Sequence, residues 1–183
     1  MSGRIGHKKS AILDFKTRKL NSHDFVLYMN STNAIARKKF DRWSSRLADS
    51  SDDVRNTAIE MIAEVGRDDL ALRESVVLKL GELLLRRPND RQHILYQIKF
   101  NLEECVASHL GLMSAIIKVS NSSESGGVAI GLLWKLIDTG RLTVGYPLLR
   151  EVNAAAAEYL RSEAEDDRDA AFQIVDWCED NLG

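Results

Sequence analysis

Residues 69–90 read DLALRESVVLKLGELLLRRPND, and this stretch carries the signals that decide the fold class. Leucine, alanine, glutamate and arginine, which favour helices, fill most of it. The side chain of Asp68 or Asp69 can cap a helix start, and Pro88 cannot continue a helix. The stretch therefore predicts one helix that begins at these aspartates and reaches Arg87.

The rest of the chain repeats this pattern with few helix breakers. The sequence has 183 residues but only two prolines, Pro88 and Pro147, and its eleven glycines stand mostly between periodic segments. Such a pattern is typical of an all-α protein, and we expect eight or nine antiparallel helices in a compact bundle or a short solenoid. The expected helices cover approximately residues 22–29, 33–47, 52–66, 69–87, 90–109, 112–119, 128–138, 147–164 and 167–181. Thr32 or Asn33 can cap the second of these helices, and Gly66 can end the third.

Length and composition indicate one domain in the cytoplasm. Residues 1–20 read as a basic, partly disordered N-terminal arm, and residues 21–183 as a single all-helical domain. No apolar run approaches the length of a membrane span, and no apolar segment follows the basic N-terminus as in a secretory signal. Cys105 and Cys178 lie far apart in the sequence, so we expect reduced thiols rather than a disulfide framework.

Residues 43–66, WSSRLADSSDDVRNTAIEMIAEVG, resemble one HEAT repeat. The family pattern places an aspartate in the turn between two helices, followed by a Val-Arg pair, a small residue and apolar positions, which here are Asp49, Val54, Arg55, Ala58, Ile62 and Val65. The resemblance implies that Asp49 accepts hydrogen bonds from backbone N–H groups and that Arg55 reaches across the turn. If the helices form a solenoid, the resemblance implies that this solenoid is HEAT-like.

The resemblance covers about one repeat. Arg73 echoes Arg55 in the next predicted helix, but it follows after 18 residues, too near for a whole repeat of about forty. A HEAT-like array of helical hairpins and an irregular helical bundle are therefore both open interpretations.

Charge is segregated along the chain. Residues 1–46 contain eleven Lys and Arg against three Asp, whereas residues 151–183 contain ten Asp and Glu against two Arg. The net charge of −2 hides this polarity. A basic end attracts polyanions or acidic proteins, and an acidic end repels the former.

The basic region gives the candidate binding surface. On a helix over residues 33–47, the four-residue spacing of Lys38, Arg42 and Arg46 predicts one exposed stripe, while Phe40, Trp43 and Leu47 face the core. The full candidate surface adds Lys39 from the same helix and four residues of the N-terminal arm, which are Lys8, Lys9, Arg18 and Lys19. Such a surface suits phosphate or carboxylate groups, and a merely solvated helix face has the same pattern.

No catalytic or cofactor signature accompanies the charge. Cys105 and His109 lie four residues apart but lack further ligands for a metal, so we expect no catalytic residues, no metal and no cofactor. We predict a non-enzymatic helical protein that binds a protein partner through oppositely charged surfaces, without a membrane partner. The alternative is a nucleic-acid-binding protein that uses the basic N-terminal region. A second alternative is an enzyme whose site is assembled in space, and self-association through the acidic tail is also open.

Overall fold

The computed structural model describes residues 22–122 and 125–182 of the chain. The chain divides into two compact units, Met1–Ile35 and Ala36–Gly183. The expected boundary after residue 20 lies outside the described residues. The architecture below is that of the second unit.

The prediction of an all-α chain is confirmed. Over the described ranges there are nine α-helices, one short 3-10 turn and no strand. None of these helices is long and apolar enough to cross a membrane. The elements are α2 (Ser22–Arg46), α3 (Asp52–Asp68), α4 (Leu70–Arg86), η2 (Pro88–Asp90), α5 (Arg91–Asn101), α6 (Glu103–Val106), α7 (Leu110–Ser120), α8 (Gly126–Asp138), α9 (Leu149–Tyr159) and α10 (Glu165–Leu182).

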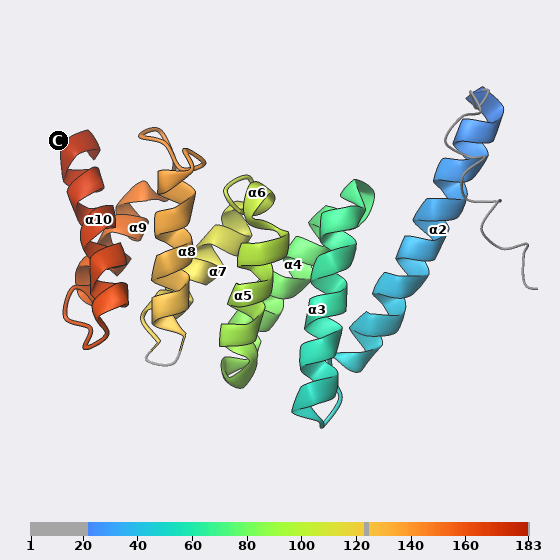
Figure 1. Ribbon diagram of the computed structural model, residues 1–183, viewed down its shortest axis with the longest axis horizontal. Helices are drawn as coiled ribbons and strands as arrows, with labels where there is room; N and C mark the ends of the chain where they lie inside the picture. Colours follow the sequence, from blue (N-terminus) through green and yellow to red (C-terminus); the bar gives the residue numbers. More distant parts are fainter. Residues whose placement is uncertain (1–21, 123–124, 183) are drawn as a thin grey trace, which may run out of the picture. The chain divides into compact units, whose positions relative to one another are not determined.

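The helices of the Ala36–Gly183 unit form two layers (Figure 1). In one layer α3 packs on α5, α5 packs on α8, and α8 packs on α10. In the other layer α4 packs on α7, and α7 packs on α9. The pairs α3–α4 and α9–α10 join the layers through short connections. One consequence matters for the site: α3, α5 and α8 are neighbours although long stretches of sequence separate them.

A continuous core lies between the layers. Helix α4 shows how the sequence produces it, because its buried residues Leu72, Val76, Leu80 and Leu84 recur every four positions. The predicted core face of α2 is also confirmed: Leu47, just past the helix, is buried, and the partly buried rings of Phe40 and Trp43 pack against the core.

Arginines near helix starts close several of the turns. The guanidinium of Arg55 donates to the carbonyl oxygens of Asp49 at 3.0 Å and Ser50 at 3.1 Å, and a carboxylate oxygen of Asp49 accepts from the Ser51 amide. This is the turn that the sequence predicted, with Arg55 reaching across it. The guanidiniums of three other arginines donate in the same way to carbonyl oxygens five to seven residues earlier, namely Arg73, Arg91 and Arg168.

Two predicted helix boundaries are wrong within residues 22–109. Helix α2 continues without a break where capping residues near Asn33 predicted a new start. Asparagine, serine and threonine cost only a few tenths of a kcal/mol each inside an exposed helix, so polar residues alone do not end one. The predicted helix 90–109 is interrupted at Leu102, which is buried and separates α5 from α6.

Two further boundaries also differ. Gly66 lies inside α3 and does not end it. A Cβ at this position would come within 2.8 Å of a methyl carbon of Val76 on α4, which explains why the residue is glycine. This glycine permits close packing of two helices instead of ending one. The helix predicted over 147–164 is shorter, since it begins only at Leu149 and ends at Tyr159. Asp69, by contrast, caps α4 as predicted, accepting from the amides of Ala71 and Leu72.

We expect Gly126→Ala to destabilise the protein by about 2 kcal/mol. A Cβ at this first residue of α8 would collide with the backbone carbonyl oxygen of Ser120 and with Tyr159. Gly131→Ala in the same helix is the matched control, because nothing lies within 4 Å of a Cβ there. The control should stabilise by about 0.5–1 kcal/mol through helix propensity. Urea denaturation of both variants checks the contrast, and equal effects would contradict it.

Candidate functional site

The predicted basic stripe lies on the second half of α2. Lys38, Arg42 and Arg46 are exposed there, as their spacing predicted. Lys39 points elsewhere, since its ammonium group lies 3.3 Å from the Glu64 carboxylate on α3 and its side chain is half-buried. The four arm residues of the predicted surface, Lys8, Lys9, Arg18 and Lys19, lie outside the described residues.

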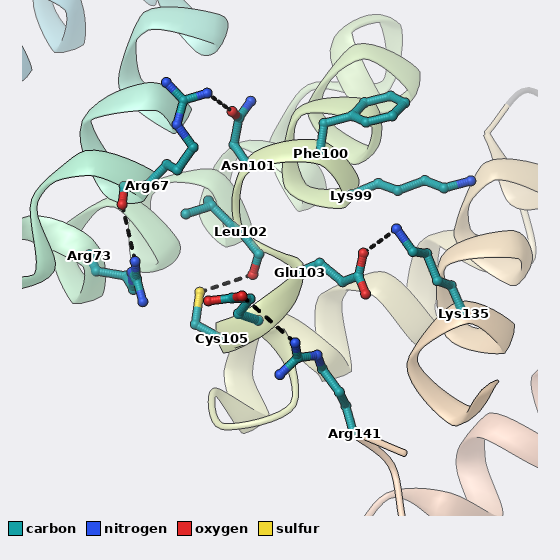
Figure 2. A pocket seen from close by; sticks show the side chains of 11 residues that line it. Arg67, Arg73, Lys99, Phe100, Asn101, Leu102, Glu103, Cys105, Lys135 and Arg141 are labelled. Atoms are coloured by element: carbon teal, nitrogen blue, oxygen red, sulfur yellow. Dashed lines mark hydrogen bonds and ion pairs between the residues drawn. The ribbon is translucent and has the colours of Figure 1, made fainter. Parts of the chain in front are cut away.

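A second basic region, which no local sequence pattern predicts, surrounds a hollow of about 390 Å³ (Figure 2). We call it the basic hollow. Its lining comes from the ends of α3, α5 and α8, the start of α4, the α5–α6 connection with α6 itself, and the segment after α8. Five cationic side chains line it, which are Arg67, Arg73, Lys99, Lys135 and Arg141.

The two-layer fold explains why these cations meet. Arg67, Lys99 and Lys135 lie in the last turns of α3, α5 and α8, respectively. The carbonyl end of a helix carries partial negative charge, so a cation in each last turn stabilises its own helix. Because the three helices are neighbours in one layer and end on the same side, their cations converge on one hollow (Figure 2).

Two carboxylates hold cations at the α8 side of the hollow. Lys135 is ion-paired with Glu103, and Arg141 lies 3.9 Å from a carboxylate oxygen of Glu104. The Lys135 and Arg141 side chains remain 39% and 38% exposed, so both cations stay accessible to a ligand. Lys99 also lines the hollow, and no ion pair to it occurs among the residues that the structure describes.

Two arginines are fixed at the α3 side. Arg73 donates to the carbonyl oxygens of Gly66 at 2.9 Å and Arg67 at 3.2 Å. Arg67 donates to the side-chain oxygen of Asn101 at 2.8 Å and to the Asp68 carboxylate at 2.8 Å. The hydrogen bond from Arg67 lowers the pKa of Asp68, while Asp68 raises the pKa of Arg67. These contacts position both guanidiniums before any ligand arrives.

An aromatic ridge borders the basic hollow. Phe100 is 72% exposed and lines the hollow, and Tyr96 lies one helical turn earlier on α5. The two rings stack with centroids 6.3 Å apart and planes 9° apart. An exposed ring beside fixed cations offers apolar contact to the alkyl parts of a bound chain.

Cys105 is a buried thiol. Its sulfur donates to the Leu102 carbonyl oxygen at 3.0 Å, and burial raises the pKa of its thiol. Burial likewise raises the pKa of Cys178. Over the described ranges, no group of three or more His, Cys, Asp or Glu side chains is arranged to hold a metal ion.

Both thiols should therefore resist modification in the folded protein. A raised pKa keeps them protonated at neutral pH, and only the thiolate reacts. We expect a thiol-specific reagent to react with neither cysteine within minutes in native protein and with both in urea. Rapid native reaction at either position would contradict this burial.

The acidic end forms a docked helix. Helix α10 buries Ala171, Ile174 and Cys178 against the core, as the interleaved apolar residues predicted. Its opposite side is exposed and acidic. Within the described part of the chain, no ion pair joins the α10 acids to a lysine or arginine.

The sequence contained one signal for the basic hollow. Arg67, Lys99 and Lys135 follow each other at intervals of 32 and 36 residues, close to the length of one helical hairpin with its connections. Without knowing which helices are neighbours, nothing distinguishes these cations from others on the surface. No family model, curated protein or solved structure matches the chain in the comparisons that were made.

Proposed function

We propose that the protein is a non-enzymatic interaction protein whose basic hollow binds an acidic segment of a protein partner. The observation that supports this most is the convergence of five cationic side chains, from four helices and the α8–α9 connection, around one hollow. Each cation has a structural role at its own helix or turn, yet their shared location creates a positive site.

The arrangement favours carboxylates of a short segment over a long polyanion. Glu103 and Glu104 line the same hollow and repel a continuous phosphate backbone. Residues 36–183 carry 19 Lys and Arg against 25 Asp and Glu, so the surrounding unit is net acidic. A polyanion that extends beyond the hollow meets this repulsion, whereas a few carboxylate side chains do not.

A ligand can bind in the hollow when its carboxylates contact these cations directly or share them with their present partners. Arg73 and Arg67 are held by carbonyl oxygens and Asn101, so little side-chain entropy is lost when they bind. Lys99 is available for a first carboxylate of the ligand. Lys135 and Arg141 are partly exposed and can share their internal acids with a second carboxylate.

The test is a titration with a fluorescently labelled peptide of Glu, Asp, Gly and Ser that contains no aromatic residue. We expect Lys99→Ala to weaken binding about 5- to 10-fold, a typical loss for one charged contact. Lys79→Ala on α4 is the matched control, since Lys79 does not line the hollow. The affinity of this variant for the peptide should stay within about twofold of the wild-type value. Equal losses in the two variants would reject the assignment to this site.

Labelled duplex DNA and single-stranded RNA are titrated in parallel. Binding of the peptide without comparable nucleic-acid binding supports the proposal. If nucleic acid binds more tightly than the peptide and Arg42→Ala weakens it more than Lys99→Ala, the proposal is wrong. The basic N-terminal region would then be the functional surface.

A further inference from the structure

We propose that a second copy of this chain docks the exposed side of α10 into a separate hollow between α2 and α3. We call the first surface the α10 stripe, and it consists of Glu165, Asp169, Phe172, Asp176 and Asp180. We call the second surface the α2–α3 hollow, which measures about 310 Å³ and is lined by Arg42, Trp43, Arg46, Asp53, Val54 and Thr57. This proposal does not depend on the basic hollow.

The α10 stripe has an aromatic residue at its centre. Its five members recur every three or four residues and therefore share one side of the helix, opposite the buried Ala171, Ile174 and Cys178. Phe172 is 57% exposed, and two acidic residues of the stripe lie on either side of it. An exposed ring flanked by charge can act as an interface anchor when a pocket of complementary chemistry receives it.

The α2–α3 hollow has the complementary chemistry. Trp43 and Val54 supply an apolar floor, and the Arg42 guanidinium carbon lies 5.4 Å from the centre of the Trp43 ring. Arg42 and Arg46 are exposed at the rim, where they can meet acids that flank an inserted ring. Arg46 lies 3.7 Å from a carboxylate oxygen of Asp49 but its side chain is 56% exposed, so it can share this partner with an incoming acid. One acid, Asp53, also lines the hollow.

The two surfaces cannot meet within one copy. Helices α3 and α10 belong to the same layer, and α5 and α8 lie between them in the order of packing (Figure 1). Packed helices are about 8–10 Å apart, so the α10 stripe lies tens of ångströms from the α2–α3 hollow of its own chain. Contact between copies is therefore heterologous, and it produces open head-to-tail chains or rings.

Sedimentation velocity of the full chain tests this proposal. We expect wild-type protein at up to roughly 1 mM to associate at about 50 mM salt and much less at about 500 mM, since charges carry much of the contact. Phe172→Ala should reduce the association constant at least about tenfold. Phe100→Ala is the matched control, because it removes an even more exposed ring that lies outside both surfaces, and it should leave association unchanged.

Charge reversal provides a complementation test. R42E/R46E and D169R/D176R should each remain monomeric alone, with unchanged circular dichroism. Mixed in equal amounts they should associate, because the intact α10 stripe of the first meets the intact α2–α3 hollow of the second. A monomeric wild type at all concentrations overturns the proposal. So does loss of association in Phe100→Ala, which would place the contact at the basic hollow, or a mixture that stays monomeric.

Discussion

Asp90→Ala is expected to lower the midpoint of thermal unfolding by about 10 °C, the largest effect of any single polar substitution that we predict. The Asp90 carboxylate lies 3.2 Å from the Arg55 side chain, and the two side chains are only 6% and 11% exposed. Hydrogen bonding to Asp90 raises the pKa of Arg55, so the guanidinium stays charged in the folded protein. Without Asp90 this cation is left in a desolvated place with fewer partners.

The position of the pair makes the effect global. Arg55 closes the turn before α3, and Asp90 lies in the short turn before α5. The contact therefore ties together the starts of two neighbouring helices that are far apart in sequence. Asp68→Ala is the control, because Asp68 pairs with Arg67 on the surface and is 62% exposed. Its midpoint should move by no more than about 2 °C, since exposed pairs contribute little.

Circular dichroism melts of both variants check this prediction. Similar midpoints for Asp90→Ala and Asp68→Ala would show that the buried pair contributes no more than a surface pair. A conservative variant, Asp90→Asn, keeps one hydrogen-bond acceptor and should fall between wild type and Asp90→Ala.

The second large effect concerns binding. We expect K99E/K135E to weaken binding of the labelled acidic peptide by roughly 100-fold or more. Reversal removes two attractive charges, adds two repulsive ones, and places a new carboxylate beside Glu103, the present partner of Lys135. The affinity of the wild type should itself fall as salt rises, because salt screens the attraction between the cations of the basic hollow and the acidic peptide.

K79E/K118E makes the same change in net charge elsewhere. Lys79 and Lys118 belong to α4 and α7 in the other layer and do not line the hollow. This control should lose no more than about threefold in affinity, which reflects the long-range field alone. If both double variants lose binding equally, the peptide responds to net charge and not to a site.

The sequence predicted the parts of the fold that depend on local signals. Asp69 as a helix cap, the stop at Pro88 and the core face of α2 all follow from residues within one or two turns. Gly66 was misinterpreted, because its role is a contact with Val76 on the next helix. A glycine that ends a helix and one that permits close packing have the same sequence signal.

The arginines that close the turns before α3, α4 and α5 are regularly spaced in the sequence. Arg55, Arg73 and Arg91 follow each other at 18 residues, which is the length of one helix with its turn rather than of a hairpin. The spacing therefore repeats once per helix. The resemblance of residues 43–66 to a HEAT repeat stays a prediction.

The two basic regions differ in how much sequence can reveal. The stripe of Lys38, Arg42 and Arg46 depends on a four-residue spacing within one helix, and its exposure is confirmed. The basic hollow depends on α3, α5 and α8 being neighbours, which only the packing shows. Its cations come from separate helix ends, so no local pattern contains them.

The most direct test of the central claim is to map the peptide on isotope-labelled protein by amide NMR shifts. We predict that the largest shifts fall on Lys99, Phe100 and Asn101 and on residues around Lys135. Little change is expected around Lys38 and Arg42. The opposite distribution, with shifts on α2 and none at the ends of α5 and α8, would contradict the assignment of acidic-segment binding to the basic hollow.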